Sequence, residues 1–264
     1  MKLGLISLGC AKNRIDSELF LGVAKQYNIE LTSSIDEADI IVINTCGFIE
    51  SAKQEAIDTI LEVCDYENKK IVVMGCLVER YQQSLEKSIP EVDFYFPIRD
   101  YDNIDELFKK LTSSTESHKM DYTKRVITTS NHSVYLRIAE GCDNKCAYCA
   151  IPLIRGKFKS RDFDSLIEET KVLVANGAKE ITLIAQDTTR YGTDFKDKDP
   201  RRLEHLLKAI SEINGVEWVR VLYLYPDEIT KEILSEIKEN NKVAKYFDIP
   251  IQHASNKMLK AMNR

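Results

Sequence analysis

The chain contains the stretch Gly141-Cys142-Asp143-Asn144-Lys145-Cys146-Ala147-Tyr148-Cys149, which places three cysteines at CxxxCxxC spacing in one short loop. Thiolates are the soft ligands of iron–sulfur clusters, and a four-iron four-sulfur cubane usually takes four of them. A loop that supplies only three leaves one iron of such a cluster open to an outside ligand. The loop therefore predicts a cluster with one open coordination position.

A structural zinc site is the main alternative, because CxxC pairs are also common zinc ligands. Zinc would need a fourth ligand close by. The nearest downstream histidine is His205, and His132 lies upstream, before a predicted strand. Neither gives an evident closed tetrahedral site, so the spacing favours the cluster.

Composition limits the remaining possibilities. The chain has 264 residues, of which 44% are hydrophobic and 30% charged, as expected of a globular protein with room for two domains. A net charge of -5 argues against a chain-wide basic surface, so any nucleic-acid contact is expected to be indirect. No signal peptide or membrane span is expected. The seven cysteines are those of a cytoplasmic protein that uses thiols as ligands rather than in disulfides.

Residues 1–111 alternate short apolar runs with amphipathic stretches, which predicts an amino-terminal parallel-sheet α/β domain. The expected strands are Leu3–Leu8, Ile40–Asn44 and Ile71–Gly75, and the expected helices are Asp16–Tyr27 and Glu50–Cys64. Residues 112–129 lack periodicity and are predicted to be a linker.

Residues 130–264 repeat the strand–helix rhythm of a β/α barrel. The expected strands are Val134–Ala139, Ile181–Gln186, Val219–Tyr223 and Tyr246–Ile249, and the expected helices are Leu166–Ala175, Leu203–Ile213, Glu228–Glu239 and one after Ser255. About four strands are too few to close a barrel, so the overall fold class is α/β with a partial barrel. The charged run Lys196-Asp197-Lys198-Asp199 is predicted to be a solvated loop.

Three further cysteines, Cys10, Cys46 and Cys76, each follow one of the first three predicted strands. The carboxyl ends of parallel strands share one edge of a sheet, so these thiols are expected to converge there. A glycine adjoins each of them, which permits tight turns at a crowded site. A second three-thiolate metal site is predicted, although ordinary buried cysteines are the alternative. Cys64 lies in mid-helix and is interpreted as a plain core or surface residue.

The six cysteines together resemble those of the methylthiotransferases, which join an amino-terminal cluster domain to a radical S-adenosylmethionine (SAM) barrel. The resemblance covers the whole chain. Within the family, the stretches Ser7–Asn13, Ala139–Cys142, Ile151–Gly156 and Asp248–Ser255 are similar to those of the enzymes that methylthiolate the β-carbon of an aspartate in ribosomal protein uS12. A transfer-RNA methylthiotransferase and a non-catalytic iron–sulfur scaffold are the alternatives.

The resemblance implies two 4Fe-4S clusters and SAM as cofactors. The cluster on Cys142, Cys146 and Cys149, which are the implied catalytic residues, would be reduced by a donor such as flavodoxin or ferredoxin and cleave SAM to a radical. The cluster on Cys10, Cys46 and Cys76 would deliver the sulfur to the substrate carbon.

Five residues are candidates for binding SAM. Tyr148 lies between two of the ligands, Gln186 and Asp187 end a predicted barrel strand, Arg155 is a bidentate partner for a carboxylate, and Gln252 follows another strand. Each also has a structural interpretation, as a loop aromatic, a solvated loop or a surface ion pair. The family further implies later barrel elements and a TRAM domain that this chain does not match, so a truncated barrel without that domain is expected.

Overall fold

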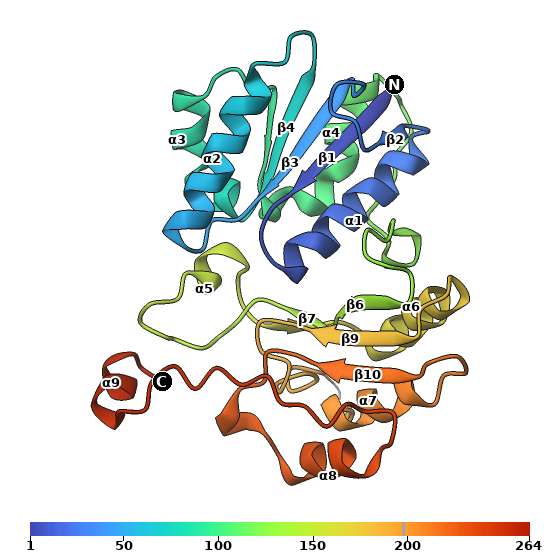
Figure 1. Cartoon of the computed structure of the whole chain (residues 1–264), viewed down its shortest axis with the longest axis vertical. Coiled ribbons are helices and arrows are strands. Elements are labelled where there is room, and N and C mark those ends of the chain that lie inside the picture. The colour runs from blue at the N-terminus through green and yellow to red at the C-terminus, as the bar shows by residue number, and fades with distance from the viewer. Residues whose placement is uncertain (197–198) are drawn as a thin grey trace. The chain divides into compact units, whose positions relative to one another are not determined.

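A computed structural model describes residues 1–196 and 199–264, and the chain divides into two compact units, Met1–Thr128 and Thr129–Arg264. Each unit contains its own parallel sheet (Figure 1). Asp197 and Lys198, from the charged run predicted to be a solvated loop, lie outside the described residues.

The first unit is built on a five-stranded sheet in the order β2-β1-β3-β4-β5, and every neighbouring pair is parallel. Its strands are β1 (Lys2–Ser7), β2 (Glu30–Thr32), β3 (Ile40–Thr45), β4 (Lys70–Gly75) and β5 (Phe94–Phe96). All six residues of β3 are buried, and its first four, residues 40–43, form a continuous apolar run, as expected of a strand covered on both faces.

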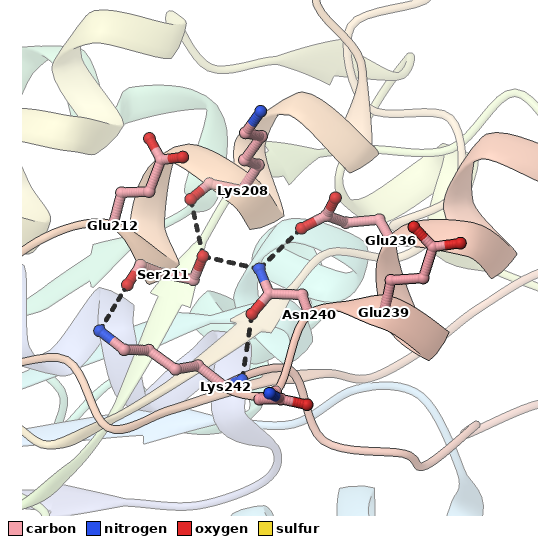
Figure 2. Close-up of a pocket in the computed structure, with 8 residues that line it drawn as sticks. Lys208, Ser211, Glu212, Glu236, Glu239, Asn240 and Lys242 are labelled. Carbon is pink, nitrogen blue, oxygen red and sulfur yellow. Dashed lines mark hydrogen bonds between the residues drawn. The ribbon is translucent and has the colours of Figure 1, made fainter.

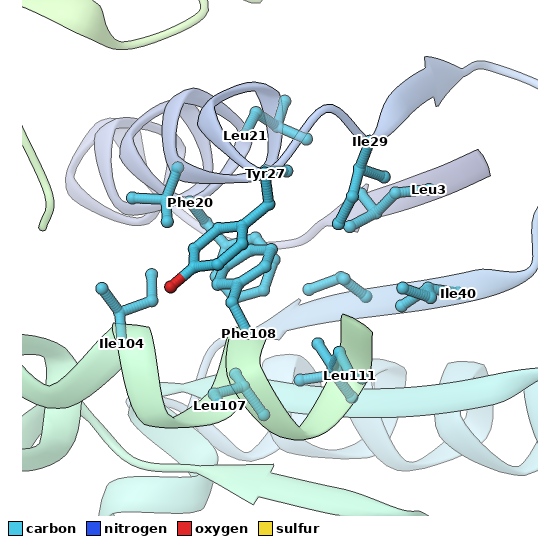
Figure 3. Close-up of a cluster of buried hydrophobic side chains, with 14 of the residues drawn as sticks. Leu3, Phe20, Leu21, Tyr27, Ile29, Ile40, Ile104, Leu107, Phe108 and Leu111 are labelled. Atoms are coloured by element: carbon cyan, nitrogen blue, oxygen red, sulfur yellow. The ribbon is translucent and has the colours of Figure 1, made fainter. Parts of the chain in front are cut away.

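Helices cover both faces of this sheet. Figure 1 shows α2 (Glu50–Cys64) and α3 (Cys76–Ser88) on one side, while α1 (Ala11–Gln26) and α4 (Ile104–Thr112) contribute to the core on the other. Because side chains alternate along a strand, Ile40 of β3 packs into the α1–α4 core and its neighbour Ile41 into the α2–α3 core. The first core is centred on Phe108, whose ring lies 5.1 Å from that of Tyr27 and 5.0 Å from that of Phe20 (Figure 3).

The segment after α4, predicted to be a linker, packs against α1. It includes the short helix η2 (Tyr122–Lys124); a second short helix, η1 (Ile98–Asn103), precedes α4. Arg125 forms a fully buried ion pair with Glu18 of α1, and the Tyr27 hydroxyl donates to the Glu116 carbonyl at 3.0 Å. These contacts make residues up to Thr128 part of the first unit.

The second unit has a three-stranded parallel sheet in the order β10-β9-β6 and a two-stranded antiparallel sheet, β7-β8. The strands are β6 (Ser133–Arg137), β7 (Ala139–Glu140), β8 (Lys159–Ser160), β9 (Glu180–Ile184) and β10 (Trp218–Val221). Neither sheet closes on itself, so the predicted partial barrel is confirmed.

The helices of the second unit are α5 (Ile151–Ile154), α6 (Phe163–Ala175), α7 (Leu203–Ser211), η3 (Pro226–Glu228), α8 (Lys231–Glu239) and α9 (Asn256–Ala261). Local side-chain caps fix two of their starts. The Asp162 carboxylate accepts from Ser165 N at 2.8 Å before α6, and the Thr230 hydroxyl accepts from Ile233 N at 3.2 Å before α8. The predicted helix 228–239 therefore begins three residues later than expected.

The predicted strand Tyr246–Ile249 is wrong. Ladder pairing beyond β10 is reduced to one bridge between Val219 and Val243. The Tyr246 amide then bonds to the Ala244 carbonyl only two residues back, at 2.8 Å, and this tight turn takes the chain out of the ladder. Among the described residues, no helix is long and apolar enough to cross a membrane.

Candidate functional site

The CxxxCxxC loop follows β7 in the second unit and is held by its own backbone. Gly141 has φ +75°, and a Cβ at this position would lie 2.1 Å from the Lys157 carbonyl oxygen, so only glycine fits. Cys142 N donates to Gly156 O at 3.1 Å, and Phe158 N donates to the Asp143 carboxylate at 3.2 Å. The stretch after the loop is thus folded back against it.

The three thiols of this loop are partly buried. Burial raises the pKa of Cys142 and of Cys149, partly offset at Cys142 by a hydrogen bond from the Asn144 amide, whose nitrogen lies 3.4 Å from the sulfur. A raised pKa disfavours a nucleophilic thiolate in the metal-free loop. It is compatible with ligands that lose their protons when a metal binds.

Arg264 is a residue at this loop that sequence reasoning missed. Its Nη1 lies 3.8 Å from the Cys146 sulfur, its guanidinium lies 3.7 Å from the centre of the Tyr225 ring, and its Nη2 donates to the Pro250 carbonyl at 3.0 Å. Residues 262–264 also support the loop backbone, because Ala147 N donates to Met262 O at 2.9 Å. A separation of 118 residues between Arg264 and Cys146 gives no sequence signal for this contact.

In the first unit, the structure brings Cys10, Cys46 and Cys76 to the same edge of the sheet. Cys10 occupies the N-cap position of α1 after β1, Cys46 follows β3, and Cys76 begins α3 directly after β4. These three strands are neighbours in the sheet. The carboxamide oxygen of Asn13 lies 3.7 Å from the Cys10 sulfur and 3.5 Å from the Cys76 sulfur, so the two thiols face one atom.

The glycines beside these cysteines leave no room for a side chain. A Cβ on Gly9 would lie 3.0 Å from the Cys46 Cβ, one on Gly47 2.8 Å from the Cys76 carbonyl oxygen, and one on Gly75 2.6 Å from the Thr45 carbonyl oxygen. The backbones of the three connections are therefore in close contact. The exposure of the cysteines is graded: Cys10 is exposed, Cys46 half-buried and Cys76 buried.

Both thiol groups suit an iron–sulfur cluster by the chemistry of their donors. A cubane takes one thiolate at each iron, so its ligands surround a cluster instead of meeting at one ion. In residues 1–196 and 199–264, no three His, Cys, Asp or Glu side chains are placed to hold a single metal ion. Cys64, at the end of α2, lies outside both groups; it is half-buried and packs against the α2–α3 core.

Two predicted SAM-binding residues lie beside the CxxxCxxC loop. Asp187 is 1% exposed, and its carboxylate accepts from the Asn144 side chain of the loop at 3.1 Å. Gln186 donates to the Glu140 carboxylate at 2.6 Å, directly before the loop. The side-chain amide oxygen of Gln186, Oε1, is buried and has no hydrogen-bond partner among the described residues, so it remains available as an acceptor.

The other three predicted SAM-binding residues differ in their surroundings. Arg155 is 8% exposed and pairs with Glu140 at 3.4 Å. Tyr148 is 46% exposed, and Gln252 is exposed with a left-handed φ of +64°. Arg155 is thus held inside the unit, whereas Tyr148 and Gln252 present side chains at its surface.

A polar pocket of the second unit lies between α7 and α8, and no cysteine is among the described residues that line it (Figure 2). The Asn240 side chain donates to the Ser211 hydroxyl and to the Glu236 carboxylate, each at 2.7 Å, and Lys242 donates to the Ser211 carbonyl at 2.7 Å. These bonds satisfy groups at the carboxyl ends of the two helices, which gives the pocket a structural explanation.

Comparison with known proteins agrees with the division of the chain into two units, Met1–Thr128 and Thr129–Arg264. Residues 136–264 match the profile of the radical SAM superfamily, and residues 2–97 match that of uncharacterized protein family UPF0004. Proteins named ribosomal protein uS12 methylthiotransferase RimO are 49% identical in Clostridium tetani and 50% identical in Clostridium novyi; each alignment covers 100% of this chain and 61% of the relative.

Residues 136–264 thus form a radical SAM domain, and over its whole length the chain is similar to the methylthiotransferases. It spans about three fifths of the length of the curated relatives it matches. Membership of the radical SAM superfamily implies SAM and a 4Fe-4S cluster as cofactors.

Solved structures support the fold. The radical SAM methyltransferase TsrM from Kitasatospora setae matches 98% of this chain and 60% of its own with a TM-score of 0.68 at 11% identity. The cobalamin-dependent radical enzyme OxsB matches 99% of this chain and 45% of its own with a TM-score of 0.65 at 12% identity. At these identities the likeness extends to the fold alone.

Proposed function

We propose that this chain is the cluster-bearing part of a radical SAM methylthiotransferase that adds a methylthio group to the β-carbon of an aspartate in ribosomal protein uS12. The observation that carries the proposal is identity of 49–50% across the whole chain to proteins of that name. The presence of two separate three-cysteine groups supports it. A ribosomal substrate would place the reaction in the cytoplasm.

In the second unit, Cys142, Cys146 and Cys149 would hold the SAM-cleaving cluster. With SAM bound and an electron from a donor such as flavodoxin or ferredoxin, this centre would supply the radical needed to take hydrogen from an unactivated carbon. The chain's own contribution is to hold three thiols in a loop fixed by Gly141 and Asp143. Partial burial of these thiols limits access of water to the site.

The proposed SAM contacts divide into direct and indirect ones. The buried, unpartnered oxygen of Gln186 is suited to accept from the SAM amino group, and Tyr148 and Gln252 offer exposed groups. Asp187 orients Asn144 in the loop, and Arg155 orients Glu140, which in turn holds the Gln186 amide. We propose that Asp187 and Arg155 position the other groups through these bonds.

In the first unit, Cys10, Cys46 and Cys76 would hold a second 4Fe-4S cluster. That cluster would supply the sulfur for the substrate carbon. Support comes from the convergence of the three chain segments and from the glycines between them. Two separate groups fit two tasks, because radical formation and sulfur delivery each need an open iron position.

Anaerobic reconstitution followed by iron and sulfide counting, SAM-cleavage and substrate assays tests the function. The expected result is two clusters per chain, cleavage of SAM, and the mass gain of a methylthio group on uS12. One cluster per chain would reject the second centre, and two clusters without SAM cleavage would favour a scaffold. Modification of transfer RNA in place of uS12 would reject the proposed substrate.

A further inference from the structure

The side chain of Asn13 contacts two of the three cysteines in the first unit. It lies in the first turn of α1 and is 1% exposed. Its Oδ1 accepts hydrogen bonds from both Cys10, at 3.7 Å, and Cys76, at 3.5 Å. One carboxamide thus connects two thiols that are 66 positions apart in the chain.

Neighbouring groups fix the orientation of this amide. Asn13 Nδ2 donates to the Thr45 carbonyl at 2.8 Å, directly before Cys46. The side chain of Asn44 donates to the Asn13 backbone carbonyl at 2.7 Å and to the Ser17 hydroxyl at 2.9 Å. Because Asn13 is buried, water has little access to replace these bonds. The amide therefore contacts two of the cysteines and the strand end that leads into the third.

We propose that Asn13 is a positioning residue for the amino-terminal cluster. Its carboxamide holds Cys10 and Cys76 toward one point before iron binds and lies next to both ligands afterwards. The inference rests on the proposed second cluster and adds a residue to it that is neither a ligand nor a substrate contact. Outer-shell groups of this kind typically change metal affinity about 10- to 100-fold when they are removed.

The chemistry of a neutral amide explains why asparagine suits this position. A thiol donates to the amide oxygen in the metal-free state, and the amide places no charge beside the thiolates that form when iron binds. An ionised aspartate of nearly the same shape has only acceptors and would add a negative charge beside two thiolates. The interpretation therefore predicts an order of cluster affinity: asparagine, then alanine, then aspartate. A purely space-filling role would instead rank aspartate above alanine.

The test uses a background in which the second-unit ligands are removed, Cys142→Ala/Cys146→Ala/Cys149→Ala, so that only the amino-terminal cluster is observed. Asn13→Ala, Asn13→Asp and the control Asn103→Ala are made in it. Asn103 is an exposed asparagine of the first unit that precedes α4 and makes no side-chain cap there. Cluster affinity is measured by chelator competition at pH 8, the cluster is characterised by electron paramagnetic resonance after reduction, and folding by thermal melting.

We expect Asn13→Ala to weaken cluster affinity about 10- to 100-fold, Asn13→Asp to weaken it further, and Asn103→Ala to leave affinity and spectrum unchanged. Wild-type affinity in Asn13→Ala, or aspartate ranking above alanine, would overturn the role of Asn13 while leaving the second cluster in place. A background protein that binds no iron would instead overturn the amino-terminal cluster itself and the role of Asn13 with it. If Asn13→Ala does not fold, the near-isosteric Asn13→Asp decides: retention of background affinity would reject the proposal.

Discussion

The two cysteine groups of this protein are built in opposite ways. Cys142, Cys146 and Cys149 lie within eight positions on one loop, whereas Cys10, Cys46 and Cys76 lie on three connections of a parallel sheet. The first group depends mainly on hydrogen bonds to residues 156–158, with one further backbone bond from Ala147 to Met262. The second depends on the register of β1, β3 and β4 and on the helices that cover them. A local group should therefore be lost by local changes, and a dispersed group by destabilising the whole unit.

The largest expected effects come from the loop ligands. Cys142→Ala, Cys146→Ala or Cys149→Ala should each abolish SAM cleavage, because two thiolates are too few for the cubane that three hold. The measurement is 5′-deoxyadenosine formation by the reduced protein. Cys64→Ala is the matched control and should keep full cleavage, since Cys64 belongs to neither group; loss of activity there would indicate a general effect of removing a thiol.

Replacing a dispersed ligand should separate the two activities. Cys10→Ala, Cys46→Ala or Cys76→Ala should spare SAM cleavage, lower the iron content by about half and block methylthio transfer. Iron counting and mass spectrometry of the uS12 product measure this. Unchanged transfer in all three variants would remove the first-unit group from the mechanism.

Core destabilisation should distinguish the groups by their dependence on the fold. Phe108→Ala should cost the first unit about 3–5 kcal/mol, because it empties the centre of the α1–α4 core. Urea titration followed by cluster absorbance should show the Cys10, Cys46 and Cys76 centre lost at lower urea than in wild type. The matched variant Leu206→Ala removes a fully buried side chain from the second unit and should shift only the other centre. Equal shifts of both centres in either variant would contradict independent units.

Two glycines near the loop give a smaller, purely local contrast. Gly141→Ala should lower loop-cluster loading, because its Cβ would lie 2.1 Å from a backbone oxygen. Gly156 also has a positive φ, of +72°, but nothing lies within 4 Å of a Cβ there, so Gly156→Ala should cost only about 1 kcal/mol. Iron content and thermal melting of the two variants provide the comparison. Equal loss in both would mean that backbone strain, and not the close contact, controls the loop.

The smallest effect is a separate alkaline transition in each unit. Burial raises the pKa of Tyr95 in the first unit and of Tyr191 in the second. A folded-state pKa above the unfolded value of about 10 means that stability is fully present below pH 10 and is lost as the pH rises further. Tyr95→Phe should flatten this loss in the first unit and Tyr191→Phe in the second, as measured by urea midpoints from about pH 9 to 11. If the urea midpoint fell equally steeply with pH in wild type and variants, these tyrosines would not cause the alkaline loss of stability.

Most of the first unit was predictable because its signals are local. The helix at Glu50–Cys64 agrees with the prediction, and the strand at Ile40–Thr45 extends it by one residue, because long apolar or amphipathic runs carry their own period. Helix α1 starts five residues earlier than predicted, at Ala11. Its first turn carries Lys12 and Asn13, polar residues that are nonetheless buried against the sheet edge. Residues with little local preference needed tertiary contacts to be placed.

The wrong strand in the second unit has the same origin. Tyr246–Ile249 has the composition of a strand, but a strand exists only with a ladder partner, and the chain turns away after the single Val219–Val243 bridge. Arg155 remains a candidate contact for SAM, and its ion pair with Glu140 could not be predicted from the sequence. A side chain's type shows what it can bind, and its surroundings decide which partner it has.

By itself, the sequence indicated both groups of candidate ligand thiols, the α/β class and the similarity to methylthiotransferases, because spacing within a loop and position after a strand are written in the order of residues. Only the tertiary structure decided which other side chains reach those thiols. Asn13 contacts Cys76 across 63 positions and Arg264 contacts Cys146 across 118. Such contacts depend on the packing of whole elements, and no local pattern of residues records them.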